Sequence, residues 1–418
     1  MRDFSQRAAY YLAFGSAVAI LISISLSQGL LALSIVFLLL SGEKIEFPPL
    51  RLPLAVFFMT TVVALIFSGD LQGGTPQIRK FFVFGILLAI YSTFRTIGQV
   101  KLLVVSWAVV GCISGLLGVG QYLHRRQEAL AEHADYYGFF LDRRITGFAG
   151  HWMTFGGEEM IVLLMLGSFL LFAKREKSKL LLWPLFTILW IAITMGMTRS
   201  IFLLGVPVGL CYLLWRRKPI LLVALPLIAA IGIAVAPHTL RERVGSVLKP
   251  HGDLDSNAHR VVCRVTGWEM VKAHPWLGLG PEQVGKQFER YVPASVKRPL
   301  PVGWYGHLHN IYLQYAAERG ILGLLSILWF IAKAALDYIG FLRRAPLSSS
   351  ARFVLHGSIA VILAILAEGF FEYNLGDSEV LTMFLAVIAC GYVALRAEER
   401  PSTNVRAARA SAVPVPTL

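Results

Sequence analysis

His309 and Asn310 stand together where a long polar segment gives way to an apolar one. A neutral imidazole can accept a proton from a hydroxyl group near pH 7, which suits His309 to the role of general base. A lone interfacial histidine that hydrogen-bonds to a carbonyl group is the structural alternative. Gly320 and Gly323 follow, and we expect their small-residue face to let another helix approach and hold His309 in place. The pattern favours a functional His309, since ionisable residues at a membrane boundary are functional-site candidates.

Arginines offer a second kind of chemistry. Arg199 lies in a short polar break between two apolar runs, and Arg260 and Arg264 are four residues apart on one helix face. A guanidinium group is a planar fork that suits phosphate binding. The structural alternative is an interfacial anchor for Arg199 and ordinary solvent-exposed charges for the other two. Arg143 and Arg144 form a further candidate pair.

Other polar residues have weaker cases. Asp253 and Asp255 mimic the Asp-x-Asp that binds a metal–nucleotide complex in many glycosyltransferases, but they lie in a polar turn and we expect no metal there. Glu158 and Glu159 stand at the outer end of an apolar run, where a helix N-terminus stabilises carboxylates. Neither the histidines nor the 4 cysteines have the spacing of metal ligands, so we expect no metal, cofactor or disulfide.

The elements that must position these residues are membrane helices. The chain is 56% hydrophobic and only 15% charged, and its apolar runs are too long for soluble core helices. Because backbone polar groups inside a bilayer must bond internally, each run predicts a spanning helix, about twelve in all, in an all-α polytopic membrane protein. The predicted helices cover residues 9–26, 28–41, 52–68, 80–94, 102–121, 155–173, 180–197, 200–214, 219–236, 308–334, 353–372 and 379–395.

The first two predicted helices are separated only by a short break at Ser27 and Gln28. A cleaved signal peptide is the competing interpretation of the first run, since Ala17 and Ala19 form an Ala-x-Ala pattern. These small residues lie inside the apolar run rather than after it, so we expect a retained helix.

The net charge of +14 is unevenly distributed along the chain. Lysine and arginine gather in the N-terminal segment, the tail and alternate loops, whereas the short opposing turns hold only Arg79 and Lys80. This asymmetry predicts cytoplasmic termini and argues against a nucleic-acid partner. Residues 122–153 and 237–307 are basic segments on the outer side, which we expect to meet something anionic.

Two outer loops are the sizeable polar parts of the chain. The second has about seventy residues, and a loop of that length without a function would be unusual. It contains an amphipathic stretch over 258–273 and a predicted short helix near 281–291. The expected segments are N-terminal transmembrane helices (1–121), a first periplasmic loop (122–154), central transmembrane helices (155–236), a long, partly helical periplasmic loop (237–307), C-terminal transmembrane helices (308–395) and a disordered cytoplasmic tail (396–418).

Three motifs together resemble the superfamily of O-antigen ligases (WaaL) and O-antigen polymerases (Wzy). They are His309-Asn310-x9-Gly320-x2-Gly323, Arg199-x3-Leu203, and Arg260 followed by His274-Pro275-x2-Gly278-x-Gly280. The motifs lie within residues 185–335, and the helix layout extends the resemblance over most of the chain. The family usually has an aromatic residue four positions after the loop arginine, where this chain has Arg264, so either Arg260 or Arg264 could be the key loop arginine.

The resemblance implies a GT-C-like, metal-independent inverting glycosyltransferase of the bacterial inner membrane with a periplasmic active site. Such ligases transfer a finished polysaccharide from undecaprenyl pyrophosphate to lipid A-core in lipopolysaccharide biosynthesis. Arg199 and Arg260, with Arg264, are then expected to bind the pyrophosphate and stabilise its developing charge. His309 would deprotonate the acceptor hydroxyl, and Asn310 would position the base or the acceptor.

Further substrate contacts and rival functions complete the expectation. Arg143, Arg144 and Arg290 are candidate substrate-binding residues, and membrane lipids are expected partners. A Wzy-type polymerase uses the same donor, and a protein O-oligosaccharyltransferase belongs to the same superfamily. A lipid-linked glycan transporter is the alternative from another class. Transporters place charged groups near the bilayer midplane, often in repeated halves, whereas these candidates gather on the outer side of a chain without visible repeats.

Overall fold

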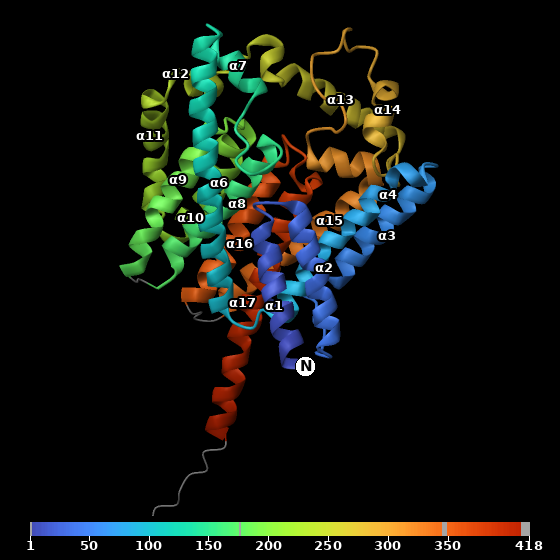
Figure 1. Cartoon of the computed structure of the whole chain (residues 1–418). Helices are drawn as coiled ribbons and strands as arrows, with labels where there is room; N and C mark the ends of the chain where they lie inside the picture. Colours follow the sequence, from blue (N-terminus) through green and yellow to red (C-terminus); the bar gives the residue numbers. More distant parts are fainter. Residues whose placement is uncertain (1, 175–176, 345–348, 411–418) are drawn as a thin grey trace, which may run out of the picture.

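The computed structural model describes residues 2–174, 177–344 and 349–410, and all regular secondary structure in these ranges is helical (Figure 1). In chain order the helices are α1 (Arg2–Ala19), α2 (Ile24–Leu40), α3 (Arg51–Phe67), α4 (Leu71–Arg79), η1 (Lys80–Phe84), α5 (Gly85–Thr93), α6 (Ile97–Ala131), α7 (Tyr136–Asp142), α8 (Trp152–Phe172), η2 (Lys177–Leu182), α9 (Trp183–Met195), the π-helix η3 (Ile201–Gly205), α10 (Val206–Arg217), α11 (Ile220–Val235), α12 (His238–Gly245), η4 (Gly252–Asp255), α13 (Asn257–Ala273), α14 (Gln283–Tyr291), α15 (Ile311–Arg344), α16 (Ser349–Glu368), η5 (Asn374–Gly376) and α17 (Ser378–Ala410).

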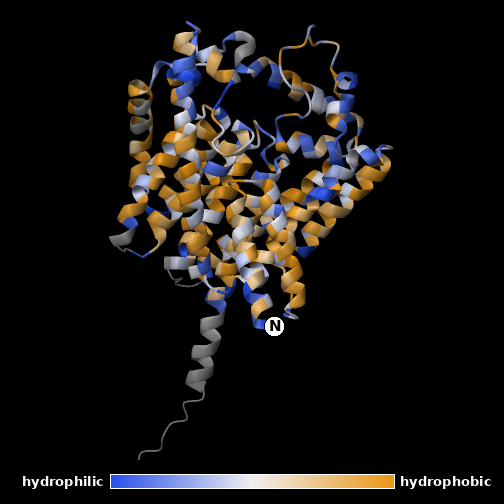
Figure 2. Ribbon diagram, in the orientation of Figure 1, coloured by the Kyte–Doolittle hydropathy of each residue, from blue (hydrophilic) through white to orange (hydrophobic). Residues whose placement is uncertain are grey.

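Long apolar helices make this a membrane protein. Among the described residues, 5 helices are long and apolar enough to cross a membrane, namely α6, α8, α15, α16 and α17. Hydrophobic residues fill the helical bundle, whereas hydrophilic residues concentrate toward its two ends (Figure 2). Every predicted apolar segment falls on a helix or on two consecutive helices. The number of spanning helices stays a prediction.

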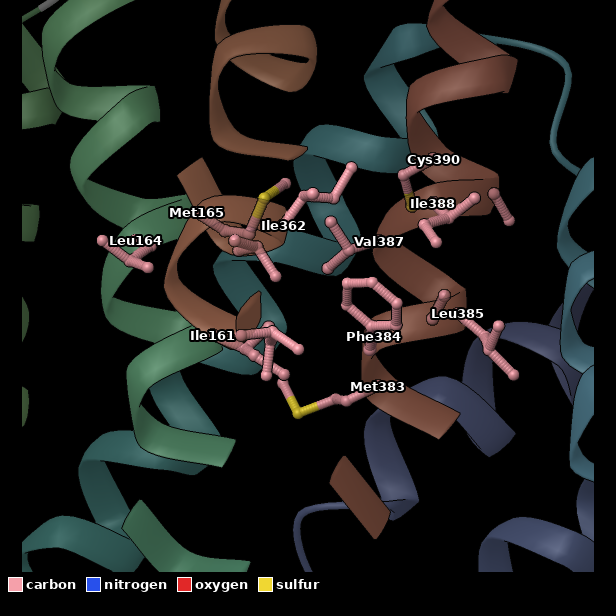
Figure 3. Packing of buried hydrophobic residues seen from close by; sticks show 14 of the residues in the cluster. Ile161, Leu164, Met165, Ile362, Met383, Phe384, Leu385, Val387, Ile388 and Cys390 are labelled. Atoms are coloured by element: carbon pink, nitrogen blue, oxygen red, sulfur yellow. The ribbon is translucent and has the colours of Figure 1, made fainter. Parts of the chain in front are cut away.

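The core of the bundle is formed by α8, α16 and α17. Ile161 of α8, Ile362 of α16 and Phe384 of α17 point toward one another in a tightly packed layer, and all three are buried (Figure 3). Lipid tails are as apolar as these side chains, so close fit and dispersion, rather than exclusion of water, hold such helices together.

The break between the first two helices differs from the prediction. It lies before Ile24, where the Ser23 side chain accepts a hydrogen bond from the backbone of Leu26 and caps α2. The predicted break at Ser27 is wrong, because the Ser27 hydroxyl donates to the Ser16 carbonyl of α1 at 2.9 Å inside a continuous helix. A serine within an apolar run can thus mark a contact between helices as well as an end.

The polar helices gather at one end of the molecule. In Figure 1, α7, α12, α13 and α14 lie at the end opposite the N-terminus, and α17 runs toward the N-terminal end. The helices α13 and α14 confirm the two predicted within the long loop. Within the described residues, the start of α1 and the end of α17 therefore lie at the same end of the bundle, and the assignment of that end to the cytoplasm stays a prediction.

Part of the segment 396–418, which was expected to be a disordered tail, is helical. The helix α17 continues to Ala410. Alanine and arginine, which recur in this segment, are strong helix formers and can extend an existing helix. Residues 411–418 lie outside the described residues, so that part of the expected tail stays a prediction.

Gly320 has a different role from the one predicted. It interrupts α15 with a φ of 66° and a ψ of −178°. The segment 275–280 docks against this break, where Leu279 N–H donates to Ala317 O at 2.7 Å and Ile321 N–H donates to Pro275 O at 2.8 Å. At Gly320 the expectation of a packed helix is therefore wrong, since the backbone of segment 275–280 lies against this residue.

Gly320→Ala is expected to destabilise the protein by about 3 kcal/mol. The positive φ disfavours alanine, and the added Cβ would lie 2.0 Å from the Trp276 carbonyl oxygen. Gly340→Ala is the matched control in the same helix, because no atom lies within 4 Å of its added Cβ. Thermal unfolding of the two variants in one detergent checks this, and equal melting temperatures would contradict the docking role of Gly320.

Candidate active site

Two adjoining cavities share three lining residues. A polar cavity of about 680 Å³ is lined by arginine, histidine, glutamate and tryptophan side chains. A second cavity of about 360 Å³, here called the apolar cavity, is lined half by leucine, valine and phenylalanine and half by polar side chains. Arg199, Arg260 and His309 line both. Three of the predicted catalytic residues, far apart in sequence, therefore meet at one junction.

The backbone at His309 is held in an unusual conformation. Its φ is 48°, a left-handed value that is uncommon for any residue other than glycine. The His309 N–H donates to Nδ1 of His307 at 3.0 Å. The His309 ring Nδ1 lies 2.9 Å from Oε1 of Glu372. Such strain persists only where the surroundings enforce it, and it is common at functional sites.

Asn310 fixes the start of α15 beside the base. Its Oδ1 accepts a hydrogen bond from Leu313 N–H at 2.9 Å, which caps the helix. Its Nδ2 donates to the Phe370 carbonyl at 2.9 Å, and Ile311 N–H donates to the Gly369 carbonyl at 2.8 Å. These bonds tie His309 to the turn after α16, which carries Glu372. The geometry supports the predicted positioning role of Asn310.

Glu372 is the residue that sequence reasoning missed. Its buried carboxylate accepts from Arg260 at 2.8 Å through Oε2, while Oε1 faces His309. Burial opposes charge on Glu372, but the hydrogen bond from His309 and the positive charge of Arg260 lower its pKa to about 2. An ionised carboxylate at Glu372 favours a proton on Nδ1 of His309. Nε2, which lies 3.4 Å from the Trp304 carbonyl oxygen, is then the ring atom left to accept a proton. The cluster of acidic residues that joins two apolar runs, with Glu368, Asp377 and Glu379 near Glu372 in sequence, was the available signal.

The two loop arginines occupy different places on α13. Arg260 is half-buried and lies at the junction of the cavities, where it pairs with Glu372. Arg264 is exposed one turn later and lines only the apolar cavity. The guanidinium of Arg260 is therefore the one beside the base. Which of the two is the key arginine for the substrate stays a prediction, which the position of Arg260 favours.

Arg199 holds the start of α13 in place. Its guanidinium donates to the Ser246 hydroxyl at 3.0 Å, and to Asn257 Oδ1 at 2.6 Å. It also donates to the Asp255 carbonyl. Burial and the neighbouring Arg243 lower the pKa of Arg199 to about 10. Because the guanidinium donates to these protein groups, the contacts of Arg199 position α13. Its predicted contact with substrate is untested.

Arg144 provides a cation in the polar cavity. Its Nε donates to the Leu141 carbonyl at 3.1 Å, and its guanidinium stacks 4.6 Å from the centre of the Trp152 ring. Burial and the charges of Arg243 and Arg260 lower its pKa to about 9. No carboxylate among the described residues forms an ion pair with Arg144. Its remaining guanidinium donors are available for an anionic ligand.

The other two predicted substrate-binding arginines lie away from both cavities. Arg143 is exposed, with its guanidinium 4.3 Å from the Phe139 ring. Arg290 is exposed on α14 beside Tyr291. Neither lines a cavity described here. The structure therefore brings Arg144, but not Arg143 or Arg290, to the junction region.

Among the acidic candidates, Asp255 holds part of the scaffold together. Asp255 is fully buried and binds Arg243 at 2.8 Å, together with the Tyr137 hydroxyl and the backbone of His251. The side chain of Asp253 lies outside the described residues. Glu158 and Glu159 lie buried beyond the first turn of α8 and line neither cavity, so the predicted helix N-terminal position is wrong.

His307, His309 and Glu372 are a group whose ligand atoms lie within 4.8 Å of one another, as a metal site requires. Their hydrogen bonds show another use, however. His307 Nδ1 accepts from the His309 backbone, and Glu372 is shared between His309 and Arg260. Burial and the neighbouring His309 lower the pKa of His307 to about 3, so His307 is neutral near pH 7. The arrangement suits an oriented base.

Comparison with known families agrees with this geometry. Residues 184–328 match the family model described as O-antigen ligase. The matched region runs from α9 into α15 and contains Arg199, Arg260 and His309. Over these residues the chain is similar to the O-antigen ligase family, which agrees with the resemblance stated above. A search of curated proteins found no significant match.

Proposed function

We propose that this protein is an O-antigen ligase, which transfers a polysaccharide from undecaprenyl pyrophosphate to a sugar hydroxyl of lipid A-core. One observation carries the proposal. An apolar cavity and a polar cavity meet at Arg260 and His309. A lipid-linked glycan has a hydrocarbon tail, a charged pyrophosphate and a carbohydrate head. These parts suit the apolar cavity, the cations at the junction and the polar cavity, respectively. The family match supports the same class of substrate.

The apolar cavity suits the donor lipid. Leu203 and Leu204 line it from the α10 side, and Phe370 and Phe371 line it from the turn after α16. In this arrangement the isoprenoid chain lies against these side chains, and the pyrophosphate reaches Arg260 and Arg264. Fixed guanidinium groups stabilise the negative charge that develops on the departing pyrophosphate. They supply this charge without a metal ion.

The transfer step follows from the position of His309. Its Nε2 accepts the proton of the acceptor hydroxyl while the hydroxyl oxygen bonds to the anomeric carbon of the glycan. The bond between that carbon and the pyrophosphate oxygen breaks, and its electron pair leaves with undecaprenyl pyrophosphate. Attack from the side opposite the leaving group inverts the anomeric centre. Glu372 stabilises the imidazolium that forms.

The proposal includes a place in the cell. We place the protein in the bacterial inner membrane, with a GT-C-like arrangement of about twelve spanning helices. The termini lie in the cytoplasm and the cavities open toward the periplasm. Two features support this orientation, namely the basic residues near both termini and the position of the outer helices at the opposite end (Figure 1).

Rival functions share parts of this site. A Wzy-type polymerase or a protein O-oligosaccharyltransferase would use the same donor and the same base, and they differ in the acceptor. A transporter needs its charged groups near the bilayer midplane. His309, Arg260 and Glu372 lie instead at helix termini beside the outer helices, which favours transfer chemistry over transport.

Arg260→Ala is expected to weaken binding of an undecaprenyl pyrophosphate about tenfold or more. The variant removes the cation at the junction of the cavities. Arg241→Ala is the matched control, since Arg241 is exposed on α12 and lines neither cavity. Native mass spectrometry of the detergent-solubilised proteins with the lipid measures binding directly. Equal affinity in the Arg260 and Arg241 variants would contradict a pyrophosphate site at Arg260.

A further inference from the structure

Trp304 presents an exposed aromatic ring on the loop that precedes α15. Its side chain is 65% exposed and lines the polar cavity. Gly306 lies directly against the indole, since a Cβ at Gly306 would be 2.1 Å from the ring atom Cζ2. The ring also packs edge-on against the His307 imidazole, with 4.7 Å between centroids. The indole is therefore held in place while one side remains open.

The backbone of Trp304 lies beside the proposed base. Its carbonyl oxygen is 2.9 Å from Nε2 of His259 and 3.4 Å from Nε2 of His309. The second of these nitrogens is the one that takes a proton in the proposed transfer. In the proposed transfer that proton comes from the acceptor hydroxyl. Trp304, which lies beside Nε2, is therefore placed to contact the acceptor rather than the donor lipid.

The polar cavity also offers a second aromatic group and a cation. Trp152 lines the same cavity, with the Arg144 guanidinium stacked on it. Aromatic faces bind the C–H faces of sugar rings by apolar contact, and a free guanidinium binds phosphate or carboxylate groups. Two indoles and an available cation are the chemistry that recognises an anionic oligosaccharide.

We infer that Trp304 is the stacking platform for the acceptor sugar, and that Arg144 on Trp152 binds an anionic substituent of the same acceptor. This inference rests on the proposed function and deepens it. It assigns the donor lipid to the apolar cavity and the acceptor to the part of the polar cavity lined by Trp304, Trp152 and Arg144. It also names the acceptor class as an oligosaccharide that carries phosphate or carboxylate groups.

The test measures binding of delipidated, phosphorylated core oligosaccharide to purified protein by isothermal titration calorimetry, without donor. Trp304→Ala is expected to weaken binding about tenfold, as loss of a stacking ring does elsewhere, whereas Trp304→Phe retains most of the affinity. Trp268→Ala is the matched control, because Trp268 is 54% exposed in the same long loop but lines neither cavity. In steady-state assays of Trp304→Ala, the KM for acceptor should rise about tenfold, and the KM for donor should stay within about twofold of wild type.

A second arm tests the anion contact. Arg144→Ala is expected to weaken binding of the phosphorylated oligosaccharide, and enzymatic removal of the phosphates should abolish the difference from wild type. Unchanged acceptor affinity in Trp304→Ala would overturn the platform, and so would a loss that Trp304→Phe fails to restore. Equal losses of donor and acceptor affinity would also overturn it. Failure of the proposed function is distinct, since wild-type protein would then bind the oligosaccharide yet transfer no glycan.

Discussion

His309→Ala reduces the rate of glycan transfer on the order of a thousandfold, within the range expected for loss of a positioned base. The structure gives three reasons. His309 lies at the junction of the two cavities, its Nδ1 is bound to a buried carboxylate, and its left-handed backbone fixes the direction of the ring. Alanine removes the proton acceptor and leaves the arginines that bind the pyrophosphate.

The informative measurement is a single-turnover rate with donor already bound. Because donor binding depends on the apolar cavity and Arg260, the donor affinity of the variant should stay within a few-fold of wild type. His238→Ala is the matched control, since His238 is exposed on α12 and paired with Glu242. A His309→Ala variant that transfers glycan within a few-fold of the wild-type rate would remove His309 from the chemistry.

Glu372→Gln is expected to lower kcat about a hundredfold and to leave the KM for both substrates nearly unchanged. Glutamine has the size of glutamate but cannot stabilise an imidazolium by charge. Its amide group can also donate to Nδ1 of His309, which would place the proton on Nε2 and block the base. The pKa of Glu372, lowered to about 2, means that the wild-type carboxylate is charged throughout the neutral range.

A purely structural role for Glu372 predicts a different result. Loss of a buried partner of Arg260 would lower the melting temperature and raise KM together with any change in kcat. Glu269→Gln, which removes an exposed partner of Lys272 on α13, is the control for charge removal near the site. A variant at Glu372 with normal kcat, or with losses that follow its stability alone, would contradict the orienting role.

The helices were predictable because their signal is local. An apolar run of spanning length has few alternatives in a bilayer, so segments such as α8 and α16 follow from composition. The break before α2 was misplaced because the residue type does not show that Ser23 caps α2 whereas Ser27 contacts α1. The kink at Gly320 was not predicted, because nothing in the neighbouring sequence shows that segment 275–280 docks there.

The site was predictable only in part. His309 and Arg260 carried recognisable motifs, and the structure brings them together with Arg199. Glu372 carried none, because it lies 63 residues after His309 in a turn whose position depends on packing of α15 against α16. Arg143 and Arg144 looked equivalent in sequence, yet only Arg144 faces the cavity. Neighbouring residues outside regular helices can point in opposite directions, and the pattern alone does not say which.

The most direct test of the central claim is the identity of the product made by the wild-type chain. Purified protein in liposomes receives undecaprenyl pyrophosphate-linked glycan and rough lipopolysaccharide, with EDTA present, and the lipids are separated and analysed by mass spectrometry. We expect glycan on lipid A-core together with released undecaprenyl pyrophosphate. Longer lipid-linked glycans with unmodified lipopolysaccharide would identify a polymerase instead, and intact donor carried across the membrane without transfer would contradict the enzyme itself.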